Sequence, residues 1–116
     1  MRFAVIGCGL IGQKRVRSFK GRHCLAVASD TAPLRAEALA SAWPGARAVA
    51  DWRAAVETPG VDAVIVSTTN DSLAPVTLAA IQLGHHVIVE KPAARGSSEL
   101  LPVVDLASHS SAARLV

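Results

Sequence analysis

Hydrophobic positions along the chain form short β-branched runs that alternate with longer stretches of helical spacing. Such runs, bounded by turn residues, are typical of strands covered on both faces. They predict strands at 3–6, 24–29, 46–50, 61–67 and 86–90, with a sixth opening at 114–116. The stretches between them predict helices at 11–21, 33–42, 52–56, 73–83 and about 97–108.

Local signals place the ends of several helices. In the first helix, Ile11, Val16 and Phe19 are expected to face inward. Asp51 is predicted to cap the short third helix, and 70–72 to cap the fourth, which Gly84 ends.

The alternation of strands and helices predicts an α/β fold. Right-handed crossovers would give an open, doubly wound, mostly parallel sheet with helices on both faces. The 116 residues have room for one core and little more, so 1–116 is expected to be one domain that ends as the sixth strand begins.

Composition narrows the classes of function. Hydrophobic residues make up 51% of the chain and charged residues 18%, which excludes intrinsic disorder. The net charge of +3 arises from one cluster of five basic residues within 14–22; without it, seven basic residues face nine acidic ones. With only four aromatic residues as well, no nucleic-acid partner is expected.

Cysteine and histidine positions give no sign of a disulfide framework or a metal site. Cys8 and Cys24 lie 16 residues apart, and none of the four histidines has a metal-ligand spacing. No apolar run approaches the 18 or so residues of a membrane span, and Met1-Arg2 leads directly into the first strand. A cytoplasmic, reducing setting without membrane contact is therefore expected.

The strongest chemical signal is the glycine pattern GCGLIG at 7–12, which follows a strand and opens a helix. In that context Gly7 allows a tight turn, Gly9 lets the backbone approach a pyrophosphate, and Gly12 lets the helix pack closely. The helix N-terminus would then hold the phosphates. The alternative is an ordinary glycine-rich strand-to-helix turn.

Asp30, at the end of the second strand, lies 18 residues past Gly12, near the position of an acid that binds the adenosine ribose. A carboxylate there repels a 2′-phosphate, which favours NAD over NADP. Arg35 could partly offset that preference. The competing interpretations are a cap or turn role for Asp30 and a solvated helix face for Arg35.

Two further groups follow strands, at the edge where ligands bind in such sheets. The hydroxyls and amide of Ser67, Thr68, Thr69 and Asn70 could contact the ribose beside nicotinamide. The competing role is helix capping by Asn70 or Asp71, and one residue can do both. Glu90 and Lys91 end the fifth strand, where the Lys91 ammonium could stabilise developing negative charge. Their alternative is a surface ion pair.

Together these pieces resemble the N-terminal half of the Gfo/Idh/MocA oxidoreductases, relatives of glucose-fructose oxidoreductase and inositol dehydrogenase. The resemblance covers the whole chain, and its most specific block is GHHVIVEKP at 84–92. It implies a Rossmann domain that binds NAD or NADP and hydride transfer at a sugar-like or polyol hydroxyl or ketone. Ten residues match, by position, the residues that contact the cofactor in this family: Gly7, Gly9, Leu10, Ile11, Gly12, Asp30, Thr68, Thr69, Asn70 and Glu90. Lys91 matches a lysine that contacts substrate.

The chain also departs from the family pattern. Thr69 stands where proline is common, and Leu73 where histidine is common. The C-terminal substrate domain that the resemblance implies is expected to be missing. The chain alone is therefore expected to bind cofactor weakly, to lack turnover, and to self-associate through exposed apolar surface.

Other classes of protein remain open at this point. One is a stand-alone module that senses NAD(H) or pairs with a separate catalytic chain. Another is a methyltransferase-like domain, against which the EKP block argues.

Overall fold

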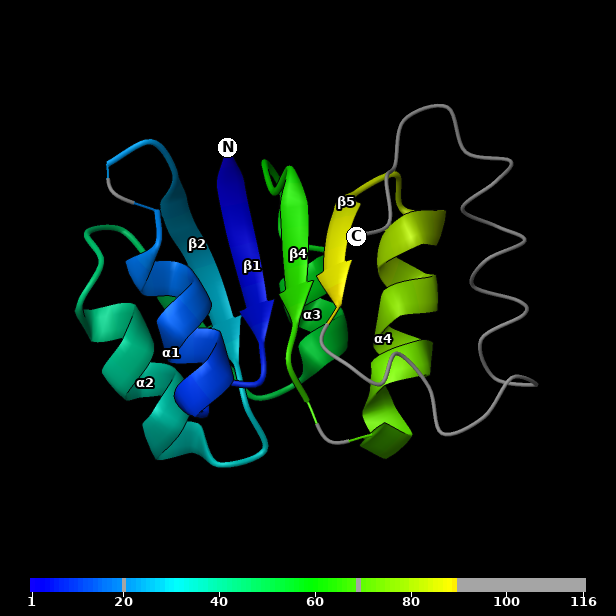
Figure 1. The fold of residues 1–116 in the computed structure, drawn as a ribbon, viewed down its shortest axis with the longest axis horizontal. Coiled ribbons are helices and arrows are strands. Elements are labelled where there is room, and N and C mark those ends of the chain that lie inside the picture. Colours follow the sequence, from blue (N-terminus) through cyan, green and yellow to red (C-terminus); the bar gives the residue numbers. More distant parts are fainter. Residues whose placement is uncertain (20, 69, 90–116) are drawn as a thin grey trace.

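The computed structural model describes residues 1–19, 21–68 and 70–89. Within them lies one five-stranded sheet whose neighbouring strands are all parallel, in the order β3-β2-β1-β4-β5 (Figure 1). The strands are β1 (Arg2–Ile6), β2 (Cys24–Ser29), β3 (Arg47–Val49), β4 (Ala63–Val66) and β5 (His86–Val89). The predicted doubly wound α/β fold is confirmed for these residues, and the fifth helix and sixth strand lie outside them.

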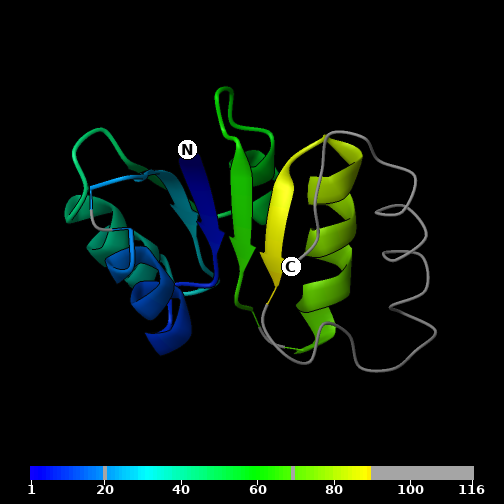
Figure 2. The ribbon, with the colours of Figure 1, turned by 45° about the horizontal axis from the view of Figure 1, so that its top comes forward.

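Four helices connect the strands: α1 (Leu10–Arg17), α2 (Pro33–Ser41), α3 (Trp52–Val56) and α4 (Asn70–Gln82). Figure 2 shows α1 and α2 on one side of the sheet and α3 and α4 on the other. A buried cluster accompanies each pair: Val5, Val16 and Leu39 belong to the first, and Val56, Val64 and Val76 to the second. The prediction of helices on both faces is therefore confirmed.

The boundaries of two helices differ from the prediction. α1 ends at Arg17, and Ile11 is 48% exposed instead of facing inward, whereas Val16 and Phe19 are buried as expected. α4 begins at Asn70, so 70–72 form its first turn and do not precede it. This start leaves Pro75 inside the helix, where its missing N–H removes one hydrogen bond.

The predicted starts of two other helices are confirmed. Pro33 is the first residue of α2, a position where its fixed backbone angle suits a helix. Asp51 caps α3 by accepting a hydrogen bond from the Arg53 N–H at 3.0 Å.

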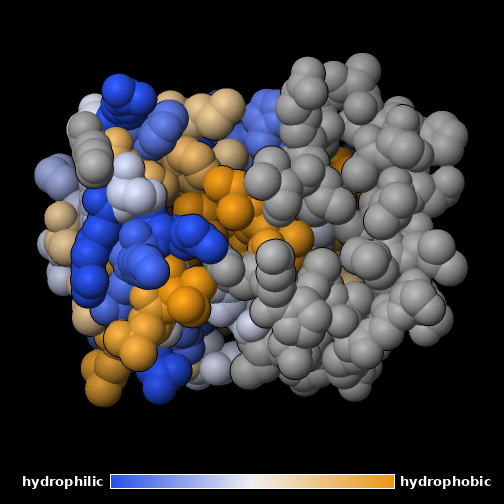
Figure 3. Space-filling view, viewed as in Figure 1, coloured by the Kyte–Doolittle hydropathy of each residue, from blue (hydrophilic) through white to orange (hydrophobic). Residues whose placement is uncertain are grey.

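Hydrophilic residues are unevenly distributed over the surface. Figure 3 shows hydrophilic residues gathered over the α1–α2 side of the face it presents. On α1, Lys14, Arg15 and Arg17 are exposed. Within the described residues, no helix combines the length and the apolar character needed to cross a bilayer.

Candidate functional site

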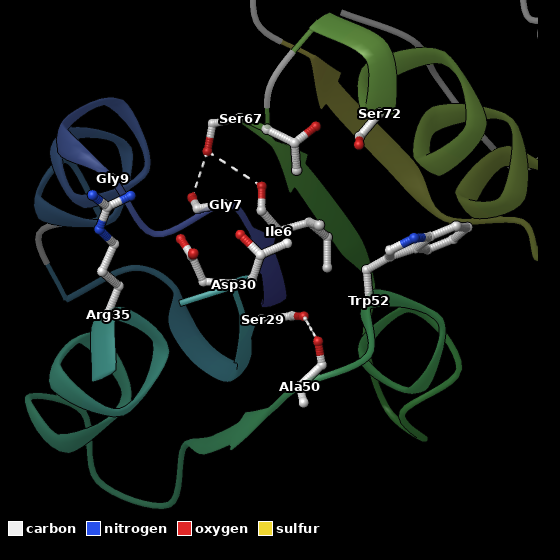
Figure 4. A pocket seen from close by; sticks show the side chains of 12 residues that line it. Ile6, Gly7, Gly9, Ser29, Asp30, Arg35, Ala50, Trp52, Ser67 and Ser72 are labelled. Carbon is white, nitrogen blue, oxygen red and sulfur yellow. Dashed lines mark hydrogen bonds between the residues drawn. The ribbon is translucent and has the colours of Figure 1, made fainter. Parts of the chain in front are cut away.

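A pocket of about 180 Å³ lies at the carboxyl ends of β1, β2 and β4 (Figure 4). The glycine loop forms one wall through Gly7 and Gly9, and Asp30 lies at the end of β2. Trp52 at the start of α3 and Ser72 in the first turn of α4 form the opposite side. In parallel α/β sheets this edge is where ligands bind, because the helix N-termini and strand ends meet there.

The three glycines of the motif have different surroundings. Gly7 has a φ of +94°, and a Cβ there would overlap the Ser67 carbonyl and lie 2.9 Å from the Thr68 nitrogen. A Cβ on Gly12 would overlap the Gly7 carbonyl oxygen and lie 2.9 Å from the Ser67 hydroxyl oxygen. The fold therefore requires both glycines for close approach of backbone to backbone.

Gly9 differs, because a Cβ there would meet no atom within 4 Å. Its φ of −75° is open to any residue, so neither packing nor backbone geometry in the protein calls for glycine. The space beside it opens into the pocket at the start of α1, where N–H groups without intrahelical acceptors face outward. The residues present thus fit a pyrophosphate that approaches the backbone closely.

Hydrogen bonds fasten the glycine loop from both sides. On the β4 side, the Ser67 hydroxyl donates to the Gly7 carbonyl at 2.7 Å. On the β2 side, the Gly7 N–H donates to the Ser29 carbonyl at 2.8 Å. From α1, the Gln13 amide donates to the Cys8 carbonyl at 3.1 Å. Most of these backbone groups are buried, so the pairing avoids the cost of unsatisfied polar atoms.

Asp30 uses both of its carboxylate oxygens in backbone hydrogen bonds. Oδ2 accepts from the Cys8 N–H at 2.7 Å and Oδ1 accepts from the Ala32 N–H at 2.7 Å. Each oxygen keeps a second lone pair, so the carboxylate can still accept from ribose hydroxyls. The turn role and the ligand role that the sequence left as alternatives are therefore compatible.

Cys8 lies beside the Asp30 carboxylate, and Arg35 lines the same pocket as Asp30. Burial, and then the nearby Asp30 carboxylate, raise the pKa of the Cys8 thiol to about 12. The protonated thiol donates a hydrogen bond to the Ser29 carbonyl at 3.4 Å. Cys8 is therefore a neutral packing residue, not a nucleophile. The exposed Arg35 extends from α2 toward the glycine-loop side of the pocket (Figure 4).

The predicted site residues divide into three groups. The pocket brings together Gly7, Gly9, Asp30 and Thr68. Leu10, Ile11 and Gly12 lie beside it in the first turn of α1, and Asn70 is the first residue of α4. Thr69, Glu90 and Lys91 lie outside the described residues, so the contacts proposed for them stay predictions.

Leu73, which stands where the family pattern often has histidine, is buried in the core cluster on the α3–α4 side. It is not among the residues that line the pocket.

Sequence reasoning did not anticipate some of the lining residues. The place of Trp52 in the pocket could not be predicted, because no sequence pattern relates the start of α3 to the glycine loop, 40 residues earlier. For Ser67, a ribose contact was expected, but not the hydrogen bond that its hydroxyl donates to the Gly7 carbonyl. A polar residue directly after a buried strand was the available signal for both Ser67 and Asp30.

The parallel sheet, the glycine loop before α1 and the acid at the end of β2 define a dinucleotide-binding Rossmann domain. A family model described as an oxidoreductase family with an NAD-binding Rossmann fold matches residues 1–116. The chain belongs to this Gfo/Idh/MocA family, as its resemblance had indicated.

Known relatives agree with this assignment. Inositol 2-dehydrogenase from Mycolicibacterium smegmatis is 34% identical over 107 residues, which cover 90% of this chain and 31% of that protein. The structure of biliverdin reductase from Synechocystis sp. PCC 6803, in complex with biliverdin and NADP+, has a TM-score of 0.87 at 26% identity and covers 98% of this chain and 37% of that one.

The fold alone is shared with myo-inositol dehydrogenase from Lactobacillus casei in complex with NAD(H) and myo-inositol. Its TM-score is 0.89 at 21% identity, with 99% of this chain and 36% of that chain covered. The chain thus spans about a third of the length of these relatives.

Proposed function

We propose that this chain is the cofactor-holding part of an oxidoreductase that moves hydride to or from a sugar-like or polyol hydroxyl or ketone. The observation that carries the proposal is the open space beside Gly9 in a loop whose other two glycines are fixed by packing. Glycine at a position where neither packing nor a positive φ requires it is explained by a ligand that approaches the backbone closely.

The described residues would divide the work of binding. The glycine loop and the N-terminus of α1 would hold the pyrophosphate, and Asp30 would accept from the adenosine ribose. Thr68 would lie on the side toward the second ribose. Bound cofactor would accept the hydride as NAD+ or donate it as NADH, and Lys91 would orient the substrate oxygen.

Asp30 supports NAD over NADP, since its fixed carboxylate would repel a 2′-phosphate. Arg35 borders the same pocket and would attract that phosphate. We therefore expect NADH to bind more tightly than NADPH, and the substitution Arg35→Ala to widen that difference.

The test is calorimetric titration of the 116-residue chain with NADH, NADPH and S-adenosylmethionine, the last representing the methyltransferase-like alternative. NADH should bind, and Gly9→Ala should weaken it roughly tenfold or more, because a methyl group would occupy the place of the pyrophosphate. Thermal unfolding of Gly9→Ala is the control for an intact fold. Binding of S-adenosylmethionine in preference to NADH, or an unaffected Gly9→Ala variant, would contradict the proposal.

A further inference from the structure

We infer that Asp30 is also a positioning residue for the phosphate-binding loop, through a clamp from its carboxylate to the Cys8 N–H. The inference rests on the proposed function only for the identity of the ligand that the loop receives. It goes beyond a ribose contact, since it makes the shape of the glycine loop depend on an acid 22 residues away.

The register of the sheet produces this contact. β1 and β2 are parallel, and Ile6 pairs with Ser29, the last residue of each strand. The residues that follow these strand ends must therefore lie side by side. Because β2 ends one residue before Asp30, the carboxylate is placed level with Gly7 and Cys8, where Oδ2 accepts the Cys8 N–H at 2.7 Å.

The two hydrogen bonds of Asp30 do different things. The bond from the Ala32 N–H spans two residues and forms a local turn, which asparagine forms as well as aspartate. The bond from the Cys8 N–H joins two separate strand ends and is strengthened by the charge of the carboxylate. The structure gives the Cys8 N–H this acceptor, outside the bonds of helix and sheet.

The clamp predicts an effect opposite to that of simple electrostatics. Removing a carboxylate beside an anion site should strengthen phosphate binding by reducing repulsion. If the carboxylate holds the loop, its removal frees the loop and weakens phosphate binding. It follows that exchanging Asp30 for a neutral residue to admit a 2′-phosphate would also loosen the pyrophosphate site.

Asp30→Asn separates the two roles in one variant. The asparagine oxygen can keep the Ala32 bond, while its NH2 group, which is only a donor, faces the Cys8 N–H. Asp62→Asn is the matched control, because Asp62 Oδ2 also accepts a backbone N–H, that of Arg2 at 2.7 Å, at the start of β1. Both variants change the net charge equally.

The first measurement needs no ligand. Amide exchange at Cys8 should become at least about tenfold faster in Asp30→Asn, relative to the core amides of Val5 and Ile65, and stay unchanged in Asp62→Asn. A wild-type scalar coupling between the Cys8 15N and the Asp30 13Cγ detects the same bond even if the variant does not fold. Unchanged Cys8 exchange in a folded variant, or no such coupling, would overturn the clamp.

The second measurement is calorimetric titration with inorganic pyrophosphate, which has no ribose. Asp30→Asn should bind it about tenfold more weakly than wild type, and Asp62→Asn about equally. Equal or tighter binding by Asp30→Asn would overturn the role in phosphate binding. If the wild-type chain binds neither pyrophosphate nor NADH, the proposed function fails, while amide exchange still decides the clamp.

Discussion

Two glycines of one motif, Gly9 and Gly12, should differ in how much the same added methyl group destabilises the fold. Gly12→Ala places a Cβ against the Gly7 carbonyl and 2.9 Å from the Ser67 hydroxyl oxygen. Because the main obstacle is backbone, it cannot move aside cheaply, and we expect a cost of about 3 kcal/mol or more from overpacking. Alanine's higher helix propensity returns about 1 kcal/mol, which leaves a net loss of about 2 kcal/mol.

Gly9→Ala is the matched control. Its Cβ would enter open space, and its φ of −75° suits alanine. Lower chain entropy in the unfolded state stabilises the variant by about 0.4–1 kcal/mol, and a poorer helix cap costs about as much. The free energy of unfolding should therefore change by less than about 1 kcal/mol.

Thermal and urea unfolding, followed by circular dichroism, measure the difference between the two variants. For a domain of this size, about 2 kcal/mol corresponds to a difference in Tm of roughly 8 °C. The reasoning is refuted if Gly12→Ala unfolds within about 2 °C of Gly9→Ala, since helix propensity would then outweigh the contact with the Gly7 carbonyl.

Two other side chains of the site allow direct tests. Trp52→Ala should weaken NADH binding several-fold in calorimetric titration, because it removes an apolar wall of the pocket. Trp43→Phe should leave the affinity unchanged, because Trp43 follows α2 and lines a separate pocket with residues of α1 and α2. Equal effects of the two variants would contradict this placement. The folded chain should react with iodoacetamide at the exposed Cys24 and not at Cys8. Folding raises the pKa of the Cys8 thiol from 9.0 to about 12, so the thiol of the unfolded state loses its proton first as pH rises. The free energy of unfolding, measured in urea, should therefore fall as pH rises above 9. Cys8→Ala should reduce that fall.

Much of the fold could be predicted from local patterns, because each pattern reports a contact made within a few residues. The strand 24–29 and the cap at Asp51 follow from such patterns and match the structure. The predicted end of the first helix was wrong. The helical spacing of apolar residues continues past Arg17, so the helix was predicted to reach residue 21, whereas α1 ends at Arg17. Ile11 was misplaced because the apolar spacing does not reveal that the first turn of α1 faces the edge of the sheet.

The sequence alone determined that the chain is a parallel α/β protein with a phosphate-type glycine loop. Alternation of strands and helices, and glycines between a strand and a helix, are short-range features that hold wherever the elements later pack. The sequence also shows an acidic residue, Asp30, near the position where such domains have an acid that binds the adenosine ribose.

Only the tertiary structure decided what these residues do to each other. Which glycine is fixed by packing depends on how closely the β4 end approaches the loop, and Ser67 and Gly7 are 60 residues apart. The clamp between Asp30 and Cys8 depends on the pairing of β1 with β2, which includes an irregularity between Phe3 and Ala4. A shift of one residue in that register would move the carboxylate away from the loop. β1 and β2 are buried on both faces, so their sequences show no alternation of apolar and polar residues that would specify the register.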